Sequence, residues 1–368
     1  MKRLSVGLVL MLLCTLSIFA QNKVISVSGR VVESDSKEPA AQATVQLLSL
    51  PDSAYAAGIA SSNKGWFTLP KVKAGKYLFI NSVYGLRSTG KLVAQQCHEL
   101  QAQGHTCLAA YGRQAVTDTA VKQLPIGGGM DQKLHWLMTR CFDRQGFSSR
   151  RATRQFLKAV DEYGPDVIWL HNLHGYYIQV ELLFSYLRQH PEIQVYWTLH
   201  DCWAFTGHCA YFTYARCEKW KTGCECCKNG KAYPRTLGPA RGQRNYRRKK
   251  AAFTGLPNLT LITPSRWLAK LTRESFLREY PVQVVPNTVD PGVFYPGESV
   301  IRQRNAMGDH YVILGVAVGW ENTKGFPDML ELRARLPKQY QMVLVGVTKR
   351  QKRRLPSGII GITATKNQ

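Results

Sequence analysis

The sequence predicts an α/β protein with two Rossmann-like domains, preceded by a short all-β segment. From residue 77 onward, continuous apolar runs alternate with stretches of helical periodicity, as expected for strands buried on both faces of a parallel sheet. A turn-rich stretch, "NTVDPGVFYP", divides these units into two series. Residues 24–77 instead alternate apolar and polar residues between turn formers.

The first twenty residues have the organisation of a signal peptide. Lys2 and Arg3 precede an apolar run from Val6 to Ala20, and the polar Gln21 follows it. The run is shorter than the roughly 20 apolar residues that a membrane-spanning helix needs. Residues 1–20 therefore predict export.

Residues 21–76 contain the all-β pattern, with short strands separated by Ser, Asp, Pro, Asn and Gly. The stretches "SGRVVESDSKEPAAQATVQLL" and "NKGWFTLPKVKAGKY" resemble the carboxypeptidase regulatory-like β-sandwich of exported Bacteroidetes proteins. The resemblance implies an adaptor module without catalytic residues.

The first strand–helix series begins with the apolar run "YLFI" at residues 77–80. After a "GLRSTG" loop, Leu92, Val93, Cys97 and Leu100 have the spacing of one helix face. The elements expected next are strand "TCLAAYG", helix 151–163, strand "DVIWLHN", helix 177–189 and strand "VYWTLHD". We assign "YLFI" to this series, which leaves the all-β segment without a closing strand.

The second series begins near "VQVVPN" and continues through strand "YVILGVAVGW", helix 327–336 and strand "QMVLVGV". We therefore expect one Rossmann-like domain at 77–285 and a second at 286–368. Two or three strands with their helices cannot cover both faces of a parallel sheet, so the second domain is expected to expose apolar surface.

The charge of the chain favours anionic partners. Lys and Arg number 49 against 24 Asp and Glu, for a net charge of +25. Phosphates and anionic lipid surfaces fit this charge, whereas no nucleic-acid recognition motif of the usual kinds is present, which disfavours nucleic acid. The basic runs "RGQRNYRRKK" and "TKRQKRRLP" are the candidate contacts, and solvated helix faces are the alternative.

The cysteines form a separate group. Six of them fall between residues 202 and 227, and Cys224 and Cys227 form a C-x2-C pair of the kind that binds zinc. Cys209 and Cys217 complete a set of four thiolates for a structural zinc. Buried free thiols are an alternative, as are disulfides if the chain is exported. A reduced cluster indicates the cytosol, so the two ends of the chain predict different compartments.

Several long stretches from residue 77 onward carry a family resemblance: "INSVYGLRSTGK", "VIWLHNLHGYYIQVELLFSYL", "VYWTLHDCWAFTGHCAYF", "CEKWKTGC", "LITPSRWLAKL" and "VVPNTVDPGVFYP". They resemble family 4 retaining glycosyltransferases of the two-Rossmann (GT-B) type, which build bacterial surface polysaccharides. The resemblance implies transfer of a sugar from a nucleoside diphosphate donor to a saccharide or lipid-linked acceptor. It implies no catalytic metal and a cytoplasmic or inner-membrane location.

The resemblance also implies site residues. His200 and Asp201 end a predicted strand and match the active-site histidine and its support, where α/β sheets hold ligands. Lys324 matches the lysine that binds the donor diphosphate, and no basic residue stands in the preceding "VGWEN". The other implied residues are Ser88, Thr89 and Gly90 for the donor and His171, Asn172 and His174 for the acceptor. The family more often has glycine where Arg87 stands.

Alternative functions follow from the departures from this pattern. The resemblance implies that 77–285 is the acceptor-side domain and that 286–368 is a truncated donor-side domain. The family's motif of two glutamates after "GIIGITATKNQ" is missing, so the transferase is expected to be impaired. A signal peptide would carry a transferase out of the cytoplasm, away from nucleotide sugars. The presence of both in one chain therefore suggests that two genes are fused near residue 76. The alternatives are an exported binding or adaptor protein acting through the β-sandwich and an inactive gene fusion.

Overall fold

The computed structural model describes residues 24–33, 36, 38–48, 55–289, 292, 294–297, 300–305 and 307–363. The predicted signal peptide lies outside these residues. Within them, no helix is both long and apolar enough to cross a membrane.

The larger unit is built on a seven-stranded sheet in which all neighbouring strands are parallel. Across the sheet the strands are β11 (Val282–Val284), β10 (Leu259–Thr263), β9 (Gln194–Thr198), β8 (Val167–Leu170), β5 (Lys76–Tyr84), β6 (Thr106–Ala115) and β7 (Lys122–Pro125). The predicted α/β class with parallel sheets is thereby confirmed.

The "YLFI" stretch lies near the middle of this sheet. Leu78, Phe79 and Ile80 are completely buried, and β5 pairs with both β6 and β8. A strand covered on both faces and paired on both edges needs a continuous apolar run, which explains the sequence pattern.

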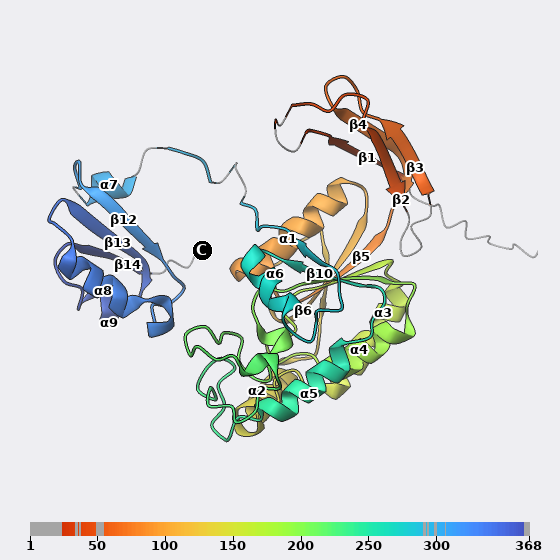
Figure 1. The fold of residues 1–368 in the computed structure, drawn as a ribbon. Helices are drawn as coiled ribbons and strands as arrows, with labels where there is room; N and C mark the ends of the chain where they lie inside the picture. Colours follow the sequence, from red (N-terminus) through yellow and green to blue (C-terminus); the bar gives the residue numbers. More distant parts are fainter. Residues whose placement is uncertain are drawn as a thin grey trace, which may run out of the picture.

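Six helices of the described chain accompany the large sheet: α1 (Arg87–Ala102), α2 (Gly129–Phe142), α3 (Arg150–Tyr163), α4 (Val180–Gln189), α5 (Gly242–Phe253) and α6 (Arg266–Arg273). In Figure 1, α3, α4 and α5 lie side by side, and α1 lies apart from them against β5 and β6. Leu183, Phe184 and Leu187 of α4 are completely buried, so α4 is the central helix of this layer.

Two small antiparallel pairs precede the large sheet. β1 (Val24–Arg30) pairs with β4 (Trp66–Lys73), and β2 (Thr44–Leu48) pairs with β3 (Tyr55–Ala60). The alternating pattern of this segment therefore corresponds to strands, in two separate two-stranded sheets.

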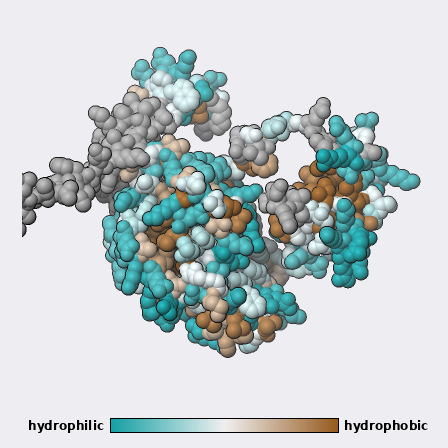
Figure 2. Space-filling model, turned by 180° about the vertical axis from the view of Figure 1, so that it is seen from behind, coloured by the Kyte–Doolittle hydropathy of each residue, from teal (hydrophilic) through white to brown (hydrophobic). Residues whose placement is uncertain are grey.

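The smaller unit is a three-stranded parallel sheet of β12 (Tyr311–Val316), β13 (Tyr340–Val347) and β14 (Ile359–Thr363). Its helices are α7 (Val300–Arg304), α8 (Phe326–Arg335) and α9 (Lys349–Lys352). Met342 and Leu344 are fully buried, whereas Leu314, Val316 and Val318 are exposed. Figure 2 shows hydrophobic side chains gathered on this unit, as expected for so short a sheet.

Two expectations about elements need correction. The strand in "VQVVPN" belongs to the large sheet, because β11 pairs with β10. Ser88, Thr89 and Gly90 were expected in a loop but lie in the first turn of α1. Periodicity could not detect this turn, since its polar side chains carry no apolar signal before Leu92.

Candidate functional site

The predicted site residues converge at one edge of the large sheet, where β5, β8 and β9 end. A cavity of about 390 Å³ opens there. Six predicted residues line it: Ser88, Thr89, Asn172, His174, His200 and Asp201. This convergence follows from topology, because the carboxyl ends of parallel strands share one edge.

Asp201 makes two polar contacts at the cleft. Its Oδ2 lies 2.8 Å from Nε2 of His174, and its Oδ1 accepts the backbone N–H of Trp203 at 2.9 Å. Burial would raise the pKa of Asp201, but the charge and hydrogen bond of His174 lower it overall. Asp201 was expected to support His200, and the structure pairs its carboxylate with His174 instead.

His200 pairs with a second histidine behind it. Its Nε2 lies 2.9 Å from Nδ1 of His171, and the two rings are stacked. Burial lowers the pKa of His200 to about 4 and holds that of the enclosed His171 well below its usual value. Both imidazoles are therefore neutral at pH 7, and His200 presents a neutral ring to the cleft.

His171 does not line this cleft, and its Nε2 is buried without a hydrogen-bond partner. It was expected in the acceptor pocket, and the structure places it behind His200. The other two residues assigned to that pocket, Asn172 and His174, do line the cleft. Nδ1 of His174 lies 3.2 Å from the hydroxyl of Tyr233, which also faces the cleft.

The start of α1 forms the opposite wall of the cleft. Ser88 and Thr89 line it, whereas Gly90 packs against the end of β5. A Cβ at Gly90 would lie 3.0 Å from Cγ2 of Val83, so this glycine permits close packing. Arg87 has a φ of +57°, a left-handed conformation that favours glycine. This conformation gives a physical reason for the expectation that glycine suits this position.

Arg113 is a cleft residue that sequence reasoning missed. It lies in β6, lines the cleft, and its Nε is buried without a hydrogen-bond partner. Together with Arg87 it gives the cleft two cations. The signal was present in "YGRQ", since a basic residue directly after a predicted apolar strand lies at the ligand-binding edge of the sheet.

Lys249 is a second residue that the sequence did not single out. It is 1% exposed, and its Nζ donates to the carbonyls of Trp203 at 2.6 Å and Thr206 at 3.0 Å. Trp203 in turn donates to Asp201. Lys249 therefore holds the loop that carries the Asp201 carboxylate.

Lys324 lies in the smaller unit, at the end of a short 3-10 turn before α8. Its Nζ is 6.0 Å from the ring centroid of Tyr211, which lines the cleft of the larger unit. The predicted donor lysine is therefore exposed and placed near the cleft.

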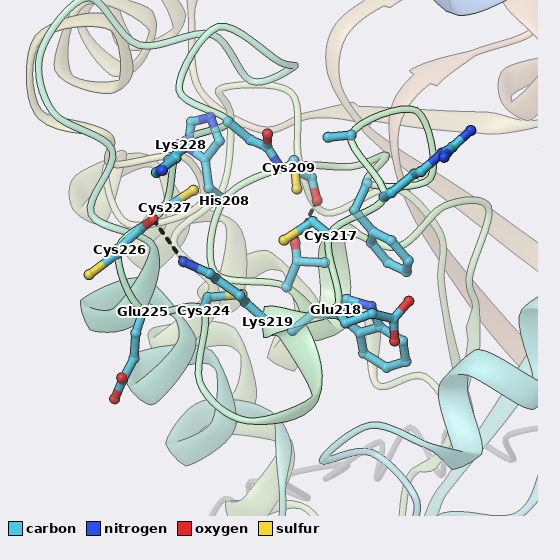
Figure 3. A pocket seen from close by; sticks show the side chains of 16 residues that line it. His208, Cys209, Cys217, Glu218, Lys219, Cys224, Glu225, Cys226, Cys227 and Lys228 are labelled. Carbon is cyan, nitrogen blue, oxygen red and sulfur yellow. Dashed lines mark hydrogen bonds between the residues drawn. The ribbon is translucent and has the colours of Figure 1, made fainter.

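The four cysteines proposed for zinc line one cavity of about 260 Å³: Cys209, Cys217, Cys224 and Cys227. Figure 3 shows their thiols set around this cavity. Among the residues that the structure describes, no three His, Cys, Asp or Glu side chains lie close enough to hold a metal ion. Burial raises the pKa of Cys209 to about 12 and of Cys224 to about 11, so these thiols are protonated as placed.

Comparison with known proteins adds sequence and fold similarities. No family model matches the chain. Over 75 residues, it is 39% identical to the Escherichia coli (strain K12) protein named as a colanic acid biosynthesis glycosyl transferase, WcaC. That match spans 19% of this chain and 18% of the length of WcaC.

Among solved structures, sucrose-phosphate synthase from Thermosynechococcus elongatus is similar with a TM-score of 0.50 and 14% identity, over 79% of this chain and 71% of that one. WaaG, a glycosyltransferase involved in lipopolysaccharide biosynthesis, has a TM-score of 0.48 and 12% identity, over 79% and 70% of the two chains. The likeness to sucrose-phosphate synthase shows the fold, which is of the two-domain GT-B type.

Proposed function

We propose that the chain is a glycosyltransferase that moves a sugar from a nucleoside diphosphate donor to a saccharide or lipid-linked acceptor with retention. The observation that carries this proposal is the cleft in which His200, Asp201 and His174 meet at the carboxyl edge of the sheet, with Lys324 nearby. The 75-residue similarity to WcaC supports the same class of reaction. We further propose domain limits of 77–285 and 286–368.

The cleft offers what departure of a diphosphate requires. Negative charge develops on the leaving group, and fixed cations around it stabilise the transition state. Lys324, Arg113 and Arg87 are the cations in reach of this role, and the hydroxyls of Ser88 and Thr89 add hydrogen-bond donors at the first turn of α1. No metal ion is required in this scheme.

His200 acts in this proposal as a neutral hydrogen-bonding group beside the reacting sugar carbon. Because its pKa is about 4, it carries no charge at pH 7 and does not repel a developing oxocarbenium ion. Asp201 keeps His174 oriented through the 2.8 Å contact. Asn172 and His174 then contact the acceptor, which enters beside Tyr233.

Calorimetric titration with UDP, GDP and TDP sugars tests donor binding. We expect one of them to bind wild type and Lys324→Ala to weaken it about tenfold or more, because a charge-assisted contact to phosphate is lost. Lys338→Ala is the matched control, since Lys338 is an exposed lysine of the same unit. A folded wild type that gives no heat with any of these sugars contradicts the proposal.

A second candidate function is binding through the all-β segment of an exported protein. The antiparallel pairs β1–β4 and β2–β3 support it, since they leave this segment separate from the large sheet. In the source cells, recovery from the periplasm with residues 1–20 removed favours this candidate. Recovery from the cytoplasm or inner membrane favours the transferase.

A further inference from the structure

Helix α2 turns an apolar face to solvent. Met130, Leu134, Leu137 and Cys141 recur at the spacing of one helix face, and all four are exposed. The exposed fractions reach 77% for Met130, 61% for Leu134 and 48% for Leu137. In Figure 2, hydrophobic side chains gather at the lower end of the larger unit, where Figure 1 places α2.

The opposite face of α2 is firmly anchored. His135 and Thr139 are buried, and Nδ1 of His135 lies 2.8 Å from Oγ of Ser149. Nε2 of the same ring accepts the backbone N–H of Gly146 at 3.1 Å. These contacts fix the rotation of the helix, so the apolar stripe faces outward as a stable feature of the fold.

The stripe is bordered by basic and aromatic side chains. Lys133 and Arg140 lie on one flank, and the Arg140 guanidinium is 5.5 Å from the ring centroid of the half-exposed Trp136. Leu237, 70% exposed, extends the patch. An apolar helix face with cations and a tryptophan at its border is typical of helices that lie in a membrane interface.

We propose that α2 docks the protein on the surface of an anionic lipid bilayer. Its apolar stripe enters the headgroup region, and Lys133 and Arg140 contact lipid phosphates. Charge complementarity favours an anionic lipid surface over a second copy of the chain, because the net charge of the chain is +25. In a dimer formed through α2, the cationic flank of one copy would face and repel that of the other. The inference has a consequence for the acceptor that rests on the proposed function: a transferase docked on a bilayer through α2 would use a lipid-linked acceptor.

Docking through α2 brings the cleft close to the bilayer. The backbone N–H of Leu237 donates to the carbonyl of Arg140 at 2.7 Å, and Tyr233, four residues earlier, lines the cleft. A second hydrogen bond links α2 to the cleft: the side chain of Gln132 donates to the carbonyl of Gly112, which precedes the cleft residue Arg113. A lipid-linked sugar can therefore reach the cleft without leaving the membrane.

Vesicle co-sedimentation of the full chain tests the proposal without any sugar nucleotide, so it is independent of the transferase assignment. The probe is a vesicle of phosphatidylcholine with phosphatidylglycerol, compared with phosphatidylcholine alone. We expect binding to the anionic vesicle only, weakened about tenfold or more by the double variant Leu134→Gln/Leu137→Gln, because two apolar side chains leave the interface. Lys133→Gln/Arg140→Gln is expected to reduce both binding and its salt dependence.

Matched controls come from the smaller unit. Leu314→Gln/Val318→Gln removes two exposed apolar side chains there, and Lys349→Gln/Arg350→Gln removes two exposed cations. The proposal is overturned if a control double variant loses as much vesicle binding as the corresponding α2 double variant. It is also overturned if the α2 double variants bind vesicles as wild type does. Self-association in the absence of vesicles also overturns the proposal if wild type shows it and the Leu134→Gln/Leu137→Gln variant does not. The apolar face of α2 would then be covered by a second copy of the chain.

The rate of cysteine alkylation tests whether α2 itself, and not residues 1–23, contacts the vesicle. Cys141 lies in the stripe, and Cys226 is exposed elsewhere, so both are accessible to a water-soluble maleimide. We expect anionic vesicles to slow alkylation of Cys141 about fivefold or more, by burial in the interface, and to leave Cys226 unchanged. Equal rates at Cys141 with and without bound vesicles contradict docking through α2.

Discussion

We expect Lys249 to make the stability of the larger unit depend on pH. Burial lowers the pKa of this lysine from 10.5 to about 7, and the charge of Asp143 opposes the shift. Its Nζ donates to two backbone carbonyls and lies 3.5 Å from the ring centroid of Trp203. A neutral amine keeps two N–H donors, so both hydrogen bonds survive deprotonation.

The sign of the effect follows from proton binding in the two states. The unfolded chain keeps its proton up to pH 10.5, whereas the folded chain loses it near pH 7. The cost of the buried ammonium is therefore fully present below pH 7 and is relieved as the pH rises from 7 to 10.5. At about 1.4 kcal/mol per pH unit, the free energy of unfolding rises by about 2 to 3 kcal/mol between pH 6 and 9.

The variant Lys249→Met isolates this effect, because methionine fills similar space without a titrating group. Urea unfolding followed by tryptophan fluorescence, at pH 6 and pH 9, gives the free energy of unfolding of wild type relative to the variant. We expect this difference to increase by about 2 to 3 kcal/mol toward pH 9. Lys250→Met, at the exposed neighbouring residue, is the control and should parallel wild type. Parallel curves for wild type and Lys249→Met would refute the reasoning.

Three further predictions concern the cleft and the cysteines. Arg87→Gly should stabilise the larger unit by about 1 kcal/mol, seen as a higher Tm, because glycine adopts the positive φ without strain. Asp201→Asn should lower kcat for sugar transfer about 100-fold or more with unfolding unchanged, because the Trp203 bond is retained while the charge facing His174 is lost. Atomic emission should find no zinc bound at the cysteines, because no three of these side chains lie close enough to hold a metal ion and the thiols of Cys209 and Cys224 are protonated as placed; one zinc per chain that is absent from the double variant Cys224→Ser/Cys227→Ser would contradict this expectation.

The sequence predicted an element correctly where burial on both faces leaves a continuous apolar run along the chain. β5 lies between two strands and is covered on both faces, so its residues form a continuous apolar run that is visible without a partner. The cleft residues were predictable for a related reason. Asn172 lies shortly after the end of β8, and His200 and Asp201 lie shortly after the end of β9; strand ends of one parallel sheet meet at one edge.

The pairing within the cleft could not be predicted, because it depends on contacts between distant segments. His174 and Asp201 are 27 residues apart, and the sequence gives no sign that this pair forms instead of His200 with Asp201. Lys249 is 46 residues from Trp203, within a basic run that reads as a solvated helix face. Only the packing of α5 under the loop shows that this lysine points inward.

Helices α5 and α2 show why charge alone is a weak basis for predicting a face that contacts a membrane. The basic run at 241–250 becomes α5, where Lys249 is buried and Arg248 pairs with Glu181, so part of its charge is used inside the protein. α2 carries few cations but exposes an unbroken apolar stripe. Lipid surfaces are held by buried apolar area together with charge, and the two coincide on α2. The helix whose apolar face is exposed in the described part of the chain is therefore the better candidate for contact with the bilayer.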